Sequence, residues 1–129
     1  MLFRSPSPQA GYEAFNALLE ENPYLTAIIT MNERAIPGIM HAIADRGWKI
    51  PGDFSLVALV SSVRMAEMMV PKLTTLEPPS AELGRLATKL LIKHLEGNGD
   101  ENPRILIPCR LVIGESSGPL PWRSSHPDR

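Results

Sequence analysis

Cysteine, aromatic residues and clustered positive charge are scarce in this 129-residue chain, and each shortage excludes a class of protein. Cys109 is the only cysteine, so no disulfide can form within the chain, and a disulfide-stapled secreted domain is excluded. Aromatic residues make up 5% of the chain, which leaves little material for the stacking platforms that bind single-stranded nucleic acid. The 13 Lys and Arg residues are scattered and are balanced by 14 acidic ones, so a free-standing DNA-binding domain is not expected.

Long hydrophobic runs are missing too. No apolar stretch approaches the roughly 20 residues of a membrane-spanning helix, and residues 1–10 lack the apolar core of a signal peptide. We therefore expect a cytoplasmic protein without a membrane partner. The hydrophobic share of 43% and the charged share of 21% are typical of one soluble globular domain.

Catalytic and metal-binding patterns are equally hard to find. The histidines His41, His94 and His126 are scattered singly, and no paired acidic spacing accompanies them, so we expect no metal or other cofactor. No Ser/His/Asp or Cys/His arrangement and no glycine-rich phosphate loop is present. The chain is therefore not expected to be an enzyme.

Helix-like and strand-like segments alternate along the chain. Helices are expected over 8–21, 33–46, 61–69 and 81–96, and strands over 26–31, 54–60, 71–76, 104–107 and 111–113. This alternation predicts an α/β fold with a layered, mainly parallel sheet and helices on both faces. The run over 54–60 is almost wholly apolar, which is typical of a central strand covered on both faces, and 26–31 is expected to be a buried strand as well.

Capping residues mark where the helices should begin. Ser7 is a preferred N-cap residue, and Pro8 suits the first helical position after it. Asn32 is in a position to cap the second helix, but Pro37 would then remove an early backbone hydrogen bond. That helix should therefore start a turn late or kink. Ser80 is expected to cap the clearest helix, which carries a continuous stripe of leucines.

Several segments, in one collinear register over about Gly11 to Ser117, resemble the lactose-repressor (LacI-type) family of transcription regulators. The matching segments are TAIITMNE over 26–33, GWKIPGDFSLV over 47–57, PKLTTL over 71–76, PSAELG over 79–84 and the closing stretch over 105–116. The PKLTTL segment is the most specific of these signals, and the shared order of all five carries the assignment.

The resemblance implies part of a periplasmic-binding-protein-like effector domain, which in this family consists of two α/β lobes joined by crossing strands. Residues 1–117 would be part of the C-terminal lobe with the crossover that returns from it, and 118–129 a disordered tail. The family's helix-turn-helix and its N-terminal lobe have no counterpart here, nor does the opening strand–helix unit of the C-terminal lobe. The parent protein would thus contact DNA only through a segment that this chain lacks.

The function implied is the effector-sensing and dimerisation part of a bacterial transcription regulator, whose ligand is a sugar or other small metabolite. Two alternatives stay open: a lobe of a secreted sugar-binding protein, and a truncated product that only oligomerises. Because a sheet that lacks an edge unit exposes apolar surface and a free strand edge, we expect the chain to form a homodimer, with exchanged segments as one route.

Asn32 and Glu33 directly follow the first expected strand, at its carboxyl end. Ligands of open α/β sheets bind outside these ends, and the family has Asn-Asp here, close to the effector. Both residues are therefore candidate effector ligands. Helix capping is an alternative role for Asn32, and the two roles can coexist.

Ser61 and Ser62 follow the second expected strand and are the other candidate effector ligands. The family typically reads Gly-aromatic-Asp-Asp at this place, and an Asp there commonly binds effector hydroxyls, whereas this chain reads ALVS over 58–61. The loss of both acids implies either an effector that is not a typical sugar or a degenerate pocket. The alternative is that Ser61 is only a strand-end residue.

Four methionines are candidates for a dimer interface, because the helices at these places contribute to the interface in the family. They are Met40, Met65, Met68 and Met69. Unbranched, polarisable methionine side chains make adaptable contact surfaces. Ordinary core packing is an equally weighted alternative.

Overall fold

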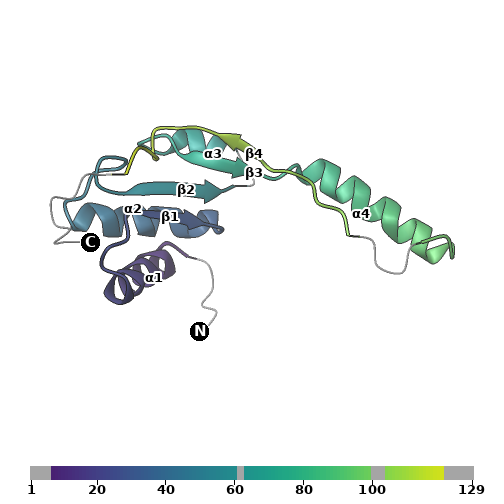
Figure 1. The fold of residues 1–129 in the computed structure, drawn as a ribbon, viewed down its shortest axis with the longest axis horizontal. Helices are drawn as coiled ribbons and strands as arrows, with labels where there is room; N and C mark the ends of the chain where they lie inside the picture. The colour runs from purple at the N-terminus through teal and green to yellow at the C-terminus, as the bar shows by residue number, and fades with distance from the viewer. Residues whose placement is uncertain (1–6, 61–62, 100–103, 121–129) are drawn as a thin grey trace.

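A computed structural model describes residues 7–60, 63–99 and 104–120 (Figure 1). The elements are α1 (Pro8–Glu21), β1 (Ala27–Thr30), the 3-10 helix η1 (Glu33–Ala35), α2 (Ile36–Asp45), β2 (Ser55–Leu59), α3 (Val63–Met68), β3 (Thr74–Glu77), α4 (Ser80–Leu95) and β4 (Arg110–Val112). The strands lie in the order β1-β2-β3-β4, parallel except for the antiparallel pairing of β4 with β3. The expected α/β class and mainly parallel sheet are confirmed.

The first two helices begin as their capping residues predict. Ser7 caps α1, and its hydroxyl accepts a hydrogen bond from the backbone nitrogen of Ala10 at 3.1 Å. Asn32 caps η1, and its Oδ1 accepts from the backbone nitrogen of Arg34 at 3.1 Å. The α-helical part starts only at Ile36, with Pro37 in its first turn, where the missing N–H of proline costs least. The late start expected from Pro37 is confirmed.

Helices α1 and α2 touch backbone to backbone at two glycines. A Cβ atom on Gly38 would lie 1.7 Å from the carbonyl oxygen of Pro8, and one on Gly11 would lie 2.2 Å from the carbonyl oxygen of Ala35. Any side chain at either position would therefore collide with backbone. The two glycines set how closely the helices approach.

The core lies on one face of the sheet. Leu56 and Ala58 of β2 point toward this face, and α1, α2 and α3 all contribute to the same cluster. Its buried members are Phe15, Leu19, Ile36, Ile39, Ala42, Ile43, Phe54, Leu56, Ala58, Val60, Ala66 and Leu73. The rings of Phe15 and Phe54 pack in a T-shaped arrangement, with their centroids 5.2 Å apart.

The expected second layer of helices is not seen among the described residues. Val57 and Leu59, on the opposite face of β2, are only half-buried, so the expectation that this strand is covered on both faces is wrong. Both crossovers, β1–α2–β2 and β2–α3–β3, move in the same direction across the sheet. Because such crossovers are right-handed, they place their helices on the same face.

Strand β1 is an edge strand, so the expectation of a buried strand over 26–31 is also wrong. Only Thr30 of its four residues is buried, and Ile29 is 63% exposed. The neighbours of β1 in the described structure lie on one side only, where β2 pairs with it. The apolar sequence of β1 alone does not show whether this strand lies at the edge or in the centre of the sheet.

Ser116 joins the beginnings of β2 and β3. Its carbonyl oxygen accepts from the backbone nitrogen of Leu56 at 2.7 Å, and its hydroxyl donates to the Leu56 carbonyl oxygen. The same hydroxyl accepts from the backbone nitrogen of Thr74 at 2.8 Å. Ser116 is fully buried. Farther on, Gly118 donates its N–H to the hydroxyl of Ser55 at 3.2 Å. Residues 121–129 of the tail expected over 118–129 lie outside the described residues, so the expected disorder stays a prediction.

Helix α4 projects away from the sheet, beyond the end of β3 (Figure 1). None of its residues is buried, although its leucine stripe reads as a core-facing helix. Pro79 is its N-cap and Ser80 is its first residue, so the expectation that Ser80 caps it is wrong by one position. The strand expected over 104–107 is not formed either: this segment runs back along α4 and pairs with no described strand before β4.

Candidate functional site

The carboxyl ends of the three parallel strands meet at one edge of the sheet, and Asn32 and Glu33 lie there, separated from the end of β1 by Met31. Asn32 is exposed and Glu33 is half-buried. The Oδ1 of Asn32 is engaged in capping η1, and its backbone nitrogen donates to the Oγ1 of Thr30 at 3.4 Å. An N-cap uses the side-chain oxygen, so the side-chain NH2 group of Asn32 takes no part in capping η1.

The second strand end is different. Val60, which stands where the family typically has an acid, is 2% exposed and packs in the core. Its backbone nitrogen donates to the carbonyl oxygen of Leu76 at 3.1 Å. Ser61 and Ser62 lie outside the described residues, so their expected role stays a prediction. No carboxylate from β2 is available at the Val60 position.

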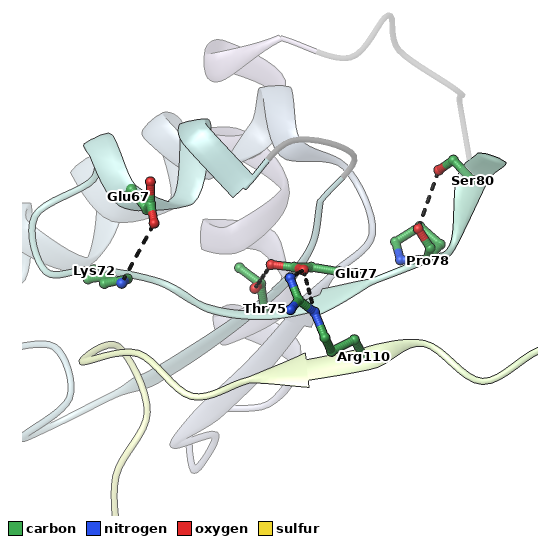
Figure 2. Close-up of polar contacts among 7 residues, drawn as sticks. All are labelled: Glu67, Lys72, Thr75, Glu77, Pro78, Ser80 and Arg110. Atoms are coloured by element: carbon green, nitrogen blue, oxygen red, sulfur yellow. Dashed lines mark hydrogen bonds and ion pairs between the residues drawn. The ribbon is translucent and has the colours of Figure 1, made fainter. Parts of the chain in front are cut away.

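The third strand end carries an ion pair that sequence reasoning missed (Figure 2). Arg110 donates from Nε and from a terminal nitrogen to the same carboxylate oxygen of Glu77, at 3.0 and 2.6 Å. The hydroxyl of Thr75 lies 3.3 Å from the other oxygen. The Glu77 side chain is 11% exposed and that of Arg110 is 70% exposed. The ion pair joins the end of β3, after which the chain leaves the sheet toward α4, to the start of β4, where the chain returns to the sheet.

The two polar groups at this edge are separate. Glu77 on β3 lies two strands away from β1, which is about 10 Å at normal strand spacing, so Asn32 and Glu77 share an edge without sharing a contact. Another ion pair, Lys72 with Glu67 at 4.0 Å, lies at the amino end of β3, where it joins α3 to the segment that leads into this strand, and it is exposed (Figure 2).

A groove of about 730 Å³ runs between α1 and the free edge of β1. Its walls are mostly apolar and include the small residues Ala10, Ala14 and Ala17 of α1 and Ile28 and Ile29 of β1. Thr30 and Asn32 also line it, which links the groove to the strand-end site. We call it the α1/β1 groove.

The four methionines do not form one surface of a single kind. Met40, Met65 and Met69 are partly buried and pack against the core, whereas Met68 is 81% exposed. Core packing thus accounts for Met40, Met65 and Met69. The expected role of the methionines in a dimer interface stays a prediction, and among the four only the Met68 side chain is already exposed.

Among the described residues, neither a metal-ion site nor a membrane-spanning helix is found. Within 7–60, 63–99 and 104–120, no three His, Cys, Asp or Glu side chains come together in a way that could hold a metal ion. Over the same ranges, none of the helices combines the length and apolarity that a membrane crossing requires.

Comparison with known families gives one match along almost the whole chain: the periplasmic binding protein-like domain, over residues 3–117. Among curated proteins, the ribose operon repressor of Halalkalibacterium halodurans is 36% identical over 101 residues. The aligned part is 78% of this chain and 30% of the repressor. The chain thus spans about a third of the length of such relatives.

Two solved structures are similar in fold and sequence. A LacI family transcriptional regulator from Enterococcus faecium, with bound ribose, superposes with a TM-score of 0.66 at 30% identity, covering 88% of this chain and 42% of the regulator. A LacI family transcriptional regulator from an Arthrobacter species, in complex with lactose, superposes with a TM-score of 0.67 at 29% identity, covering 87% and 42%.

Proposed function

Because this chain belongs to the periplasmic binding protein-like family, within its LacI-type regulators, we propose that it is the effector-sensing and dimerising part of a transcription regulator. The ligand class is a sugar or another small metabolite, as in the ribose-bound and lactose-bound relatives. DNA binding would belong to a part of the protein outside these residues. The alternatives of a secreted sugar-binding lobe and of a product that only oligomerises are kept as outcomes of the tests below.

One observation carries the proposal. Three parallel strands end at a common edge, and Asn32 and Glu33 follow the first of them with their backbone held by the η1 cap. An edge of this kind is where open α/β sheets bind ligands. The amide of Asn32 can donate to a hydroxyl and the carboxylate of Glu33 can accept two, which fits a polyhydroxylated or otherwise polar small molecule.

The sensing mechanism is a shift of populations. An effector that contacts both lobes of such a domain favours the closed arrangement by its difference in affinity for the two states, and closure repositions the DNA-reading heads. This chain supplies one side of the cleft. We therefore expect the chain alone to bind effectors weakly and a two-lobed protein to bind them well.

A chimera tests this role. In it, the chain replaces the matching part of the Halalkalibacterium ribose operon repressor, and ribose and lactose are titrated by calorimetry. We expect at least one of them to bind, and we expect Glu33→Gln to weaken that binding about tenfold or more, because a charge-assisted hydrogen bond is worth about 1.5–3 kcal/mol.

Glu20→Gln, an exposed change on α1 away from the strand end, is the matched control and should leave binding unchanged. Equal affinity of the Glu33→Gln chimera would remove Glu33 from the effector site. A folded chimera that binds none of the panel, together with a chain that forms stable dimers, would favour the product that only oligomerises.

A further inference from the structure

Asn98 and Gly99 form an asparagine–glycine pair just after α4, the only such pair in the chain. Asparagine is a thermolabile residue, because the backbone nitrogen of the next residue can attack the carbon of its side-chain amide. Glycine in the next position favours this attack, since no Cβ shields the nitrogen, whereas proline has no N–H to react. The other asparagines precede alanine, glutamate or proline; they are Asn16, Asn22, Asn32 and Asn102.

The asparagine–glycine pair lies at the end of α4 that is far from the sheet (Figure 1). Gly97, with a φ of 75°, follows the helix, and its N–H donates to the carbonyl oxygen of His94 at 3.1 Å. The N–H of Asn98 donates to the carbonyl oxygen of Lys93 at 3.0 Å. These two hydrogen bonds form a Schellman motif. The peptide bond between Asn98 and Gly99 therefore lies beyond the last hydrogen bond of the helix end.

Both reacting groups of this pair are accessible. Asn98 and Gly99 are exposed, and no residue of the described ranges is hydrogen-bonded to the Gly99 N–H or to the Asn98 side-chain amide. By contrast, Asn16 lies inside α1 and its side-chain oxygen accepts from Arg46. The side-chain oxygen of Asn32 caps η1. The fold thus restrains Asn16 and Asn32 and leaves the Asn98 amide able to meet the next backbone nitrogen.

Packing against α4 also requires the glycine of the pair. A Cβ atom on Gly99 would lie 2.9 Å from the Cα and 3.1 Å from the backbone nitrogen of His94. Any side chain at this position would therefore push the backbone away from the helix end. The same close approach that fixes Gly99 thus keeps beside Asn98 the residue type that makes asparagine most reactive.

We propose that Asn98 is a site of spontaneous deamidation and isomerisation. The deprotonated backbone nitrogen of Gly99 forms a bond to the Cγ of Asn98, the bond from Cγ to Nδ2 breaks, and the side-chain nitrogen leaves as ammonia with the proton that the backbone nitrogen has lost. Water then opens the cyclic succinimide at either of its carbonyl groups. The products are aspartate and isoaspartate, and in isoaspartate the main chain runs through Cβ and Cγ. No effector or partner enters this reaction, so the proposal is independent of the sensing role.

The modification should weaken the end of α4. Either product places a carboxylate beside the C-terminus of the helix, where the helix dipole disfavours negative charge and where Glu96 is already exposed. Isoaspartate also adds one carbon to the main chain between residues 98 and 99. We expect hydrogen exchange of the Gly97 and Asn98 N–H groups to become about two- to fivefold faster, which is the usual strength of a charge at a helix end.

Peptide mapping of the full chain by mass spectrometry, during incubation at neutral and at mildly alkaline pH, tests the proposal. The peptide that contains Asn98 should gain the mass difference between an amide and a carboxylic acid and separate into two products on chromatography. Its reaction should be at least about tenfold faster than that of Asn16, because α1 must open locally before Asn16 can react. The rate should rise with pH, since the attacking nitrogen is deprotonated. Hydrogen exchange of the aged chain then reports on the end of α4.

Two variants and one unfolded control complete the experiment. Asn98→Gln should stay unmodified and keep slow exchange at the end of α4 after ageing, whereas fresh Asn98→Asp should show the faster exchange at once. The chain unfolded in urea shows how fast Asn98 reacts without the fold. If Asn98 reacts in urea and stays intact in the folded chain, the helix end protects it and the proposal is wrong. The same mass gain in the Asn98→Gln peptide would also overturn the assignment to Asn98.

Discussion

Replacing Gly38 with alanine should lower the free energy of unfolding by about 3 kcal/mol or more, because it forces a methyl group into backbone. The added Cβ would lie 1.7 Å from the Pro8 carbonyl oxygen and 2.8 Å from the Tyr12 nitrogen. Neither atom belongs to a flexible side chain, so relief requires α1 to move away from α2. That movement would uncover Phe15 and Leu19, which α1 contributes to the core. Urea denaturation followed by circular dichroism measures the loss.

Gly84→Ala is the matched control, since it is the same substitution inside α4. A Cβ there meets nothing within 4 Å, so the substitution should raise the free energy of unfolding by the usual gain of about 0.5–1 kcal/mol for alanine over glycine in a helix. If Gly38→Ala were as stable as the wild type, α1 and α2 would not pack as closely as described.

Ser116→Ala should cost about 2–4 kcal/mol. The substitution removes the hydroxyl that accepts from the Thr74 nitrogen and donates to the Leu56 carbonyl oxygen. Leu56, Thr74 and Ser116 are all at most 2% exposed, so water cannot replace the lost partner without opening the fold. Each buried backbone group left without a partner costs about 1–3 kcal/mol. Urea denaturation again reports the change.

Ser117→Ala provides the comparison at the next residue. The Ser117 hydroxyl makes a 2.7 Å hydrogen bond to the hydroxyl of Thr74, which also receives the Gly114 N–H at 3.0 Å. Because Ser117 is less buried and its partner keeps a second bond, the expected loss is about 1 kcal/mol or less. Equal costs at 116 and 117 would contradict the bridging role of Ser116.

Local signals in the sequence predict much of this fold. The start of α1 at Ser7 and Pro8, and the delayed start of α2 caused by Pro37, follow from capping and from the missing proline N–H. The alternation of segments predicts the mainly parallel sheet. These features depend on residues that are neighbours along the chain, which is why the sequence reveals them.

The sequence-based predictions that are wrong concern features that depend on residues far away along the chain. The β1 segment is as apolar as a buried strand, yet only the strand order makes it an edge and leaves Ile29 exposed. The leucine stripe of α4 is typical of a helix that faces a core, but none of the residues of α4 is buried in the described structure. The segment 104–107 has the residue types of a strand, but no described strand lies beside it to pair with.

The candidate site was predictable only in part. Asn32 and Glu33 lie at a strand end as expected, because the pattern of an apolar run followed by polar residues is local. The Glu77–Arg110 pair joins residues 33 positions apart, and a single glutamate after a strand carries no signal of its own. Val60 could be recognised as a departure from the family, but its burial follows from core packing.

The Ser116 bridge also has a consequence for synthesis on the ribosome. The beginnings of β2 and β3 depend for their hydrogen bonds on a residue made 60 positions after Leu56. A nascent chain that has released only the first three strands leaves those backbone groups to water. We therefore expect the sheet to reach full protection from hydrogen exchange only after residues 114–118 have emerged, so that folding of this unit is completed late in translation.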